Sequence, residues 1–511
     1  MGEGLLSFYK HNVKKEWKIA FFAAFIACLL IHIYKFTNTL PNHDSLYNVY
    51  SNQDMTMSGR WLLSLACGIS SYFDLPWING LLCAVYLGIT AAIVAELFGI
   101  KNPVVIVLSA IVLAATPSTT ETLFFEYTAD GYLMGLALSA LTACLSCKGT
   151  QRQHLVFAGL CLCLSCGIYQ AYISFAVVLC ICYLLLKLLD GSISVHDSWK
   201  WIGKHVLVYG VALAAYYGIW KLILFATGRT ATDYQGISEV GKIGISTILS
   251  GAFQSVKNIL FFYLEWNVLK HPITLYGALN IVFVVALIAI LMTALIKSGV
   301  YKDLPRLCMI LFCLIASIPM ISVWCFLSEN IQYRPMMLHS ISLYYILALI
   351  LFDKWVATRI STLFGLFMVI VLFNFSVMAN ISYFYLDKCY EKSYYVGSQM
   401  MERIEELSDT AAPDTIAFIG SRAQDVVIST QFPGSRVHML TELIEEDFLF
   451  NGEHAYLYLK NTFGMDIPIA TSSQQAELIQ NPDVVKMSAW PAADSVAVVD
   501  GVLVIKLQEN P

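Results

Sequence analysis

Charged residues are scarce in this sequence. Only 13% of its 511 residues are Asp, Glu, Lys or Arg, whereas 58% are hydrophobic and the mean hydropathy is +0.66. A soluble domain has about 25% charged residues, so this chain has too few charges to cover its apolar mass in water. The composition therefore excludes an ordinary soluble protein and predicts that most of the chain lies in a lipid bilayer.

Several functional motifs are also missing. The net charge is -5 and no long Lys/Arg run occurs, which excludes a basic surface for nucleic acid. No G-x-S-x-G, H-E-x-x-H or Walker pattern is present, so ATP-driven transport by this chain alone is unsupported. Cys144 and Cys147 have C-x-x-C spacing, but no second pair or histidine couple completes a zinc set. We therefore predict no cofactor, and the motifs give no support for a divalent metal.

Long apolar runs dominate the rest of the chain. A bilayer core of about 30 Å needs roughly 20 helical residues to cross it. The stretch from Leu155 to Leu189 is too long for one span, and we expect a break at Gly167–Gln170, where polar atoms would otherwise lie deep in lipid. The sequence then predicts a polytopic α-helical membrane protein with about eleven spans. These lie near residues 17–34, 77–98, 103–118, 129–147, 154–168, 171–189, 205–226, 273–296, 307–328, 336–352 and 360–381.

The orientation follows from the loop charges. With the N-terminus inside, Lys and Arg concentrate in the cytoplasmic turns, as the positive-inside tendency requires. The opposite loops instead carry most of the acids, so any chemistry is expected to face outward. These outer acids are Asp44, Asp54, Asp74, Glu121, Glu126, Asp130, Asp233, Glu239, Glu265 and Glu329.

The C-terminal residues differ in composition from the rest. We divide the chain into a membrane domain over residues 1–385 and a small mixed α/β domain over 386–511, on the outer side. Its strongest local signal is Asp500-Gly501 between two runs of Val, Leu and Ile, which is typical of a β-hairpin. This domain has no catalytic or metal pattern, so we interpret it as a packing or acceptor-contact appendage.

Asp44 is the first candidate site residue. It follows the first predicted span, within Thr39-Leu40-Pro41-Asn42-His43-Asp44-Ser45-Leu46-Tyr47, and would lie at the membrane edge. A carboxylate there is costly unless it is solvated or paired, which makes it a functional candidate. The alternative is that Asp44 or Asn42 only caps a short helix and faces water.

Three further outer clusters combine polar and aromatic side chains. Glu126 and Asp130 are interleaved with aromatics, an arrangement that suits a sugar but is equally typical of a membrane interface. Tyr169-Gln170 forms a polar turn between two apolar runs, and such a turn needs protein neighbours or, more simply, a water-filled cavity. The third cluster is Glu329-Asn330-Ile331-Gln332-Tyr333-Arg334-Pro335, where the proline is expected to begin a helix.

Arg60 and Arg334 are candidates for binding phosphate. Arginine binds phosphate bidentately and stays charged when partly dehydrated, so both residues fit a lipid phosphate at the outer interface. The alternative for each is a snorkelling side chain that touches ordinary phospholipid headgroups.

The stretch from Thr39 to Tyr47, the later Ser58-Gly59-Arg60-Trp61, the Tyr169-Gln170 turn and the closing Asp500-Gly501 hairpin together resemble the bacterial O-antigen glucosyltransferase (GtrII-like) family. The resemblance covers nearly the whole chain in span order. It implies a GT-C-like membrane glycosyltransferase that takes a sugar from a polyprenyl-phosphate carrier. In that class an acidic residue of the first outer loop carries the chemistry, and Asp44 is the matching position. Many members have a pair of acids there, whereas Asp44 is flanked by His43 and Ser45.

The resemblance and the chemistry together suggest roles for these residues. Asp44 would be the base that takes the proton of the attacking hydroxyl, while Arg60, Arg334 and His43 would bind the donor phosphate. Contacts to donor or acceptor hydroxyls would come from Glu126, Asp130, Tyr169, Gln170 and Tyr333.

The sequence thus predicts an inverting glycosyltransferase in the bacterial inner membrane, with its N-terminus in the cytoplasm and its active site facing the periplasm. Its expected partners are the lipid bilayer, a polyprenyl-phosphate-linked sugar, most simply undecaprenyl-phosphate glucose, and a glycan acceptor such as O-antigen. A non-enzymatic transporter or flippase of lipid-linked saccharides would use the same outward cavity without a base. A structural partner in envelope assembly would need no such cavity.

Overall fold

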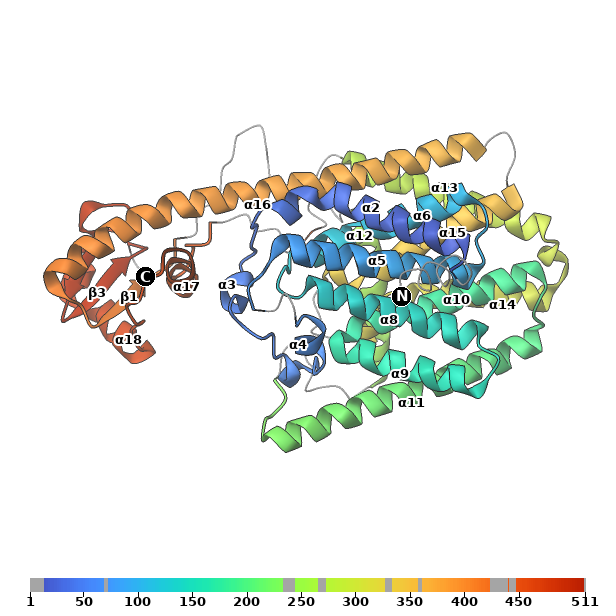
Figure 1. Cartoon of the computed structure of the whole chain (residues 1–511), viewed down its shortest axis with the longest axis horizontal. Coiled ribbons are helices and arrows are strands. Elements are labelled where there is room, and N and C mark those ends of the chain that lie inside the picture. Colours follow the sequence, from blue (N-terminus) through green and yellow to red (C-terminus); the bar gives the residue numbers. More distant parts are fainter. Residues whose placement is uncertain are drawn as a thin grey trace, which may run out of the picture. The chain divides into compact units, whose positions relative to one another are not determined.

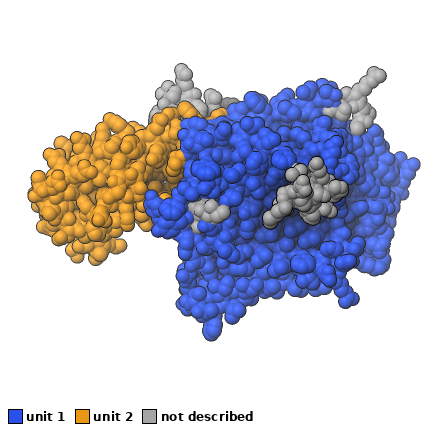
Figure 2. Space-filling view, viewed as in Figure 1, with its two compact units in different colours: residues 1–38, 50–380, 438–441 blue, residues 39–49, 381–437, 442–511 orange. Residues whose placement is uncertain are grey.

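The computed structural model describes residues 13–68, 72–232, 244–264, 273–326, 333–356, 361–422, 440 and 447–509. Four of the predicted outer acids, Asp233, Glu239, Glu265 and Glu329, lie outside these residues. The chain forms two compact units, coloured separately in Figure 2. Unit 1 consists of residues 1–38, 50–380 and 438–441, and unit 2 of residues 39–49, 381–437 and 442–511.

Long apolar helices make up most of the described structure (Figure 1). Eight described helical segments are long and apolar enough to cross a membrane, which confirms a polytopic helical membrane protein. They contain α2 (Lys15–Thr37), α5 (Pro76–Phe98), α8 (Ala129–Lys148), α10 (Ile173–Asp190), α11 (Val195–Thr227), α13 (Leu275–Lys297), α15 (Ser342–Leu351) and α16 (Ser361–Ala411).

Three shorter apolar helices accompany them: α6 (Pro103–Ala115), α9 (Arg152–Ile168) and α14 (Leu304–Met320). Each of the eleven predicted runs overlaps one of these long or short helices, while the number of actual spans stays a prediction. The sequence analysis missed α12 (Ile245–Leu264), because polar residues interrupt its apolar pattern. Two of these, Ser255 and Asn258, are buried against the segment around Ser322.

Proline and glycine set many of the helix boundaries. Pro76 and Pro103 occupy the first helical position of α5 and α6, where a missing N–H costs nothing. Gly99 and Gly191 end α5 and α10 in the left-handed conformation. Pro335 begins only a short turn, η6 (Pro335–Met337), and a second turn, η7 (His339–Ile341), precedes α15.

The helices of unit 1 pack in a chain of neighbours. The helix α2 packs against α5 and α6, α5 packs against α8, and α8 packs against α9 and α10. The predicted break in the long apolar stretch is confirmed: α9 ends at Ile168, and the turn η2 (Gln170–Tyr172) separates it from α10. Short elements complete the part of unit 1 described below: η1 (Thr56–Ser58), α4 (Leu63–Ala66) and α7 (Pro117–Thr122).

The helix α16 is longer than the sequence suggests. The last predicted span ends near residue 381, whereas the structure continues the same helix to Ala411. No proline interrupts the chain until Pro413, and Leu386, Val396 and Met400 continue a buried stripe beyond the apolar run. Within α16, the residues up to 380 belong to unit 1 and the residues from 381 belong to unit 2.

Unit 2 contains a small sheet of order β1-β3-β2. The strand β1 (Thr415–Ile419) runs parallel to β3 (Val502–Lys506), and β2 (Val496–Val499) pairs antiparallel with β3. The predicted hairpin forms, with Asp500 and Gly501 at φ 49° and 78°, as a tight two-residue turn requires.

Both faces of this sheet are covered, which explains why all five residues of β3 are buried. On one face, Ile416, Leu503 and Ile505 pack with α16 and with α17 (Gly452–Phe463). On the other, Val502 and Val504 pack with α18 (Ser472–Gln480) and α19 (Pro482–Lys486).

Residues 39–49 are also part of unit 2, although they follow the first helix in sequence. Leu46, in the short helix α3 (Ser45–Asn48), joins the core formed by α16 and α17. The side-chain amide of Asn461 in α17 donates a hydrogen bond of 2.9 Å to the carbonyl of Leu46. The sequence analysis does not anticipate this packing.

Candidate active site

The loop that contains Arg60 is hydrogen-bonded to α11. Met55 and Arg60 form an isolated antiparallel bridge that closes the loop. The indole of Trp220 donates to the carbonyl of Thr56 at 2.7 Å, and the hydroxyl of Tyr216 donates to the carbonyl of Gly59 at 3.1 Å. The loop therefore presents Arg60 from a defined backbone.

Two tyrosines hold the Arg60 guanidinium. Its Nη1 donates to the Tyr132 hydroxyl at 3.0 Å, and its Cζ lies 4.9 Å from the centre of the Tyr169 ring. The rings of Tyr132 and Tyr169 are themselves stacked, with centroids 4.7 Å apart. A planar cation against an aromatic face is stabilised by the ring quadrupole, so the two rings fix the plane of the guanidinium.

The predicted turn at Tyr169-Gln170 contacts the same loop. The side-chain amide of Gln170 donates to the carbonyl of Ser58 and to the hydroxyl of Tyr216, both at 2.9 Å. Trp61 packs directly on Gly167, where a Cβ would lie 2.7 Å from its ring. Two sequence stretches more than 100 residues apart thus meet, and protein neighbours satisfy the polar turn for which a cavity was the simpler expectation.

Tyr333 and Arg334 belong to unit 1 and lie just before the turn η6. The Tyr333 ring contacts Phe261 of α12 edge-on, with centroids 4.5 Å apart. Arg334 directly precedes η6, which packs against α7. Thr122 of α7 is hydrogen-bonded to His339 at 3.0 Å. The His339 ring in turn contacts Tyr172, which packs on Tyr169. A continuous series of contacts therefore connects the surroundings of Arg334 with those of Arg60.

Glu126 forms a buried ion pair. Its Oε2 lies 2.6 Å from Nζ of Lys35, and both side chains are at most 5% exposed. The amide of Asn79 donates to the Glu126 carbonyl at 2.9 Å. Burial raises the pKa of Glu126, while Lys35 opposes that shift. Asp130, in the first turn of α8, is also buried.

Asp74 is a member of this acidic group that the sequence analysis did not select. Its Oδ1 is buried without a hydrogen-bond partner among the described residues. Burial, together with the charges of Glu126 and Asp130, raises the pKa of Asp74 to about 7 against the effect of Lys35. Its backbone is left-handed, with φ 46°. The sequence offers no spacing signal that links Asp74 with Glu126 and Asp130, because Asp74 lies 52 positions before Glu126.

Asp44 and His43 lie in unit 2, at the start of α3. Ser45 N donates to Oδ1 of Asn42 at 3.0 Å, and the Asp44 side chain makes no cap hydrogen bond, so the capping interpretation applies to Asn42. The Asp44 carboxylate is 38% exposed and lies 3.4 Å from Nε2 of His43. It is therefore available for chemistry rather than used to hold a helix end.

The neighbours of Asp44 include two groups with displaced pKa values. Tyr47 contacts His454 edge-on at 5.2 Å, and burial and Glu453 raise the pKa of Tyr47 to about 12. Burial and His43 lower the pKa of His454. This environment keeps Tyr47 protonated and favours neutral His454 at pH 7.

A family model described as glucosyl transferase GtrII matches residues 33–352, more than half of the chain. The chain belongs to the GtrII glucosyltransferase family. This confirms the resemblance, and all nine predicted site residues lie in the matched region, whereas the sheet of unit 2 does not. No curated protein and no solved structure matches the chain. GtrII membership and the apolar helices together make this chain a glycosyltransferase of the membrane-helix type, so a sugar donor, an acceptor and a bilayer are its partners.

Proposed function

We propose that this GtrII member transfers glucose from a polyprenyl-phosphate carrier to a cell-surface polysaccharide such as O-antigen, with inversion at the anomeric carbon. The reaction takes place at the outer face of the inner membrane, with the N-terminus in the cytoplasm. The observation that carries the proposal is the Arg60 guanidinium, held by Tyr132 and Tyr169 within the region that matches the family.

Arginine suits the leaving group of this reaction. When the bond between the sugar and the carrier breaks, the electron pair stays on a phosphate oxygen, and that negative charge needs a cation. A guanidinium whose plane is already fixed stabilises it without reorganisation. Arg60 and Arg334 take this role, with His43 as a further donor-binding group.

Asp44 is the proposed general base. The acceptor hydroxyl oxygen attacks the anomeric carbon, its proton passes to the Asp44 carboxylate, and the carrier phosphate leaves from the opposite side. A single displacement of this kind converts a β-linked carrier sugar into an α-linked branch. Because phosphate is a good leaving group, the second carboxyl group of a glycosidase is not needed.

The sugar contacts follow from the polar and aromatic clusters that the sequence predicts. Asp130, Tyr169 and Tyr333 are proposed to contact donor or acceptor hydroxyls. Glu126 and Gln170 already hold Lys35 and Tyr216, so we expect them to shape the site more than to bind the sugar.

The test is transfer in membranes that contain the full chain, supplied with labelled polyprenyl-phosphate glucose and acceptor glycan. Asp44→Asn should lose about 10² to 10⁴ in transfer rate while still binding donor, because only the base is removed. Asp54→Asn is the matched control: it makes the same chemical change at another acid of the same loop, which pairs with Arg229, and should transfer at the wild-type rate.

Two results would overturn the proposal. If Asp44→Asn transfers sugar at the wild-type rate, Asp44 is not the general base. Movement of lipid-linked saccharide across the membrane without any transfer by the wild type would favour the transporter.

A further inference from the structure

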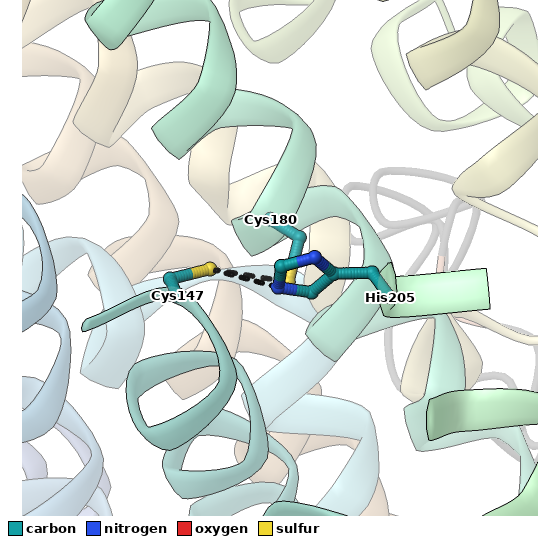
Figure 3. A group of neighbouring side chains, drawn as sticks. All are labelled: Cys147, Cys180 and His205. Atoms are coloured by element: carbon teal, nitrogen blue, oxygen red, sulfur yellow. Dashed lines mark hydrogen bonds between the residues drawn. The ribbon is translucent and has the colours of Figure 1, made fainter. Parts of the chain in front are cut away.

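Two cysteines and a histidine meet inside unit 1, away from the residues discussed so far. Cys147 lies in the last turn of α8, Cys180 in the middle of α10 and His205 in α11. Figure 3 shows the three side chains pointing toward one another from these three helices. Their ligand atoms all lie within 4.8 Å of one another, and Cys180 and His205 are buried.

Two of the distances between these ligand atoms are close to the edges of a zinc coordination tetrahedron. With Zn–S near 2.3 Å and Zn–N near 2.0 Å, a tetrahedral ion places two sulfurs about 3.8 Å apart and a sulfur and a nitrogen about 3.5 Å apart. The Sγ atoms of Cys147 and Cys180 are 3.4 Å apart, and Nε2 of His205 lies 3.8 Å from Sγ of Cys147. A shift of a few tenths of an ångström would bring both pairs to zinc geometry.

The surroundings prepare His205 to act as a ligand. Its Nδ1 lies 2.8 Å from the carbonyl oxygen of Trp201. A carbonyl only accepts, so Nδ1 carries the proton and the lone pair of a neutral imidazole is on Nε2, which faces the sulfurs. This hydrogen bond to the second ring nitrogen is the usual support of a metal-bound histidine.

Cys180 also has a hydrogen-bond partner outside the proposed ligand set. The Tyr209 hydroxyl lies 3.1 Å from Sγ of Cys180 and 3.3 Å from the hydroxyl of Ser146. A hydroxyl that donates to a thiolate stabilises the deprotonated form that a metal requires.

We propose that Cys147, Cys180 and His205 bind one Zn²⁺ ion, with a fourth position open to a further oxygen ligand. Binding displaces one proton from each thiol to solvent, so two thiolates balance the two charges of the ion. A neutral complex avoids the cost of burying a net charge among apolar helices. Cu⁺ on the same ligands would leave a net negative charge. The ion would tie α8, α10 and α11 together.

A disulfide explains the cluster less well. It would need the sulfurs to close to about 2.05 Å and gives no role to the oriented imidazole. The turn after α8, which Lys148 and Arg152 flank, also lies on the side predicted to be cytoplasmic, where thiols stay reduced.

The experiment uses the full chain in detergent micelles, stripped of metal and titrated with Zn²⁺ or with Co²⁺ as a spectroscopic probe. We expect about one zinc per chain, and a cobalt complex with a thiolate charge-transfer band and tetrahedral visible bands. Cys147→Ser, Cys180→Ser and His205→Ala should each lose at least tenfold in zinc affinity. The Cys147→Ser and Cys180→Ser variants should also weaken the charge-transfer band.

Cys144→Ser is the matched control. Cys144 lies one turn before Cys147 on α8 but lines an apolar groove of about 500 Å³ beside α2 and α5, so its loss should leave zinc binding unchanged. The wild-type titration does not depend on whether any variant folds. No tetrahedral cobalt spectrum in the wild type, preference for Cu⁺ over Zn²⁺, equal loss of binding in Cys144→Ser, or a Cys147–Cys180 disulfide found by mass spectrometry would each overturn the proposal.

Discussion

The guanidinium of Arg60 lies over the ring of Tyr169, with its Cζ 4.9 Å from the ring centre, and donates to the hydroxyl of Tyr132. Arg60 comes from the loop between α2 and α5, Tyr169 from the turn between α9 and α10, and Tyr132 from the start of α8. Three segments that are distant in sequence therefore determine the orientation of one cation.

Arg60→Lys should lower kcat/KM for sugar transfer by about 10- to 100-fold. Lysine keeps the charge but loses the planar contact with the Tyr169 ring and the ability to bind phosphate through two parallel hydrogen bonds. Arg229→Lys is the control, because Arg229 pairs with Asp54 and is 45% exposed. Unchanged steady-state kinetics in Arg60→Lys would show that the geometry of the guanidinium does not matter.

Gly59→Ala tests whether transfer requires the hydrogen bonds that hold the Arg60 loop against α11. Gly59 has φ 83°, and an added Cβ would lie 2.5 Å from both Nε2 of Gln170 and the hydroxyl of Tyr216. Gly99→Ala introduces similar left-handed strain, at φ 64°, with nothing within 4 Å. Both variants should lose about 1 kcal/mol of stability from strain, but only Gly59→Ala should lose most of its transfer rate. Equal transfer rates in the two variants would argue against this role of the loop.

Lys35→Met should destabilise the protein by about 3 to 5 kcal/mol, since it leaves the Glu126 carboxylate buried without its cation. Adding Glu126→Gln should recover most of that loss. The measurement is unfolding by SDS in mixed micelles. Lys101→Met provides the control: Lys101 pairs with Glu16 but is 75% exposed, so its loss should cost no more than about 1 kcal/mol. A double variant as unstable as Lys35→Met would mean that the pair is not coupled.

Much of the fold follows from local sequence signals. The apolar runs predict the positions of eleven helices, the polar turn at Gly167–Gln170 predicts the break between α9 and α10, and Asp500-Gly501 predicts the hairpin. These signals depend on hydrophobicity and turn chemistry within a few residues. The helix α12 lacks such a signal, because its polar face packs against protein instead of lipid.

The sites depend on contacts that the sequence does not encode locally. Arg60 and Gln170 are singled out separately, yet nothing in their spacing indicates that they reach the same loop. Asp74 has no distinguishing neighbour in sequence, and its pKa is raised by burial and by the charge of Glu126, 52 positions away. The proposed zinc ligands have no local signal for the same reason, because Cys147, Cys180 and His205 lie on three different helices.

The Asp74 carboxyl should make stability depend on pH with a sign opposite to that of most acids. Its pKa is about 7 in the folded protein and about 3.9 when unfolded. Between these values the folded state holds a proton that the unfolded state has released, so the stabilising contribution present below pH 3.9 is lost as the pH rises through 7. Asp74→Asn cannot ionise. The gain in melting temperature of this variant over the wild type should therefore be small at pH 5 and larger at pH 8.

Asp54→Asn should behave in the opposite way in the same melting experiment. Hydrogen bonds from Arg229 and Thr56 lower the pKa of Asp54, so its stabilising contribution is present above its unfolded pKa and is lost as the pH falls through the folded value. The variant should melt below the wild type at pH 8. If Asp74→Asn also melts below the wild type at pH 8, by as much as at pH 5, then Asp74 is charged and stabilised across this range, and its burial beside Glu126 does not control its ionisation.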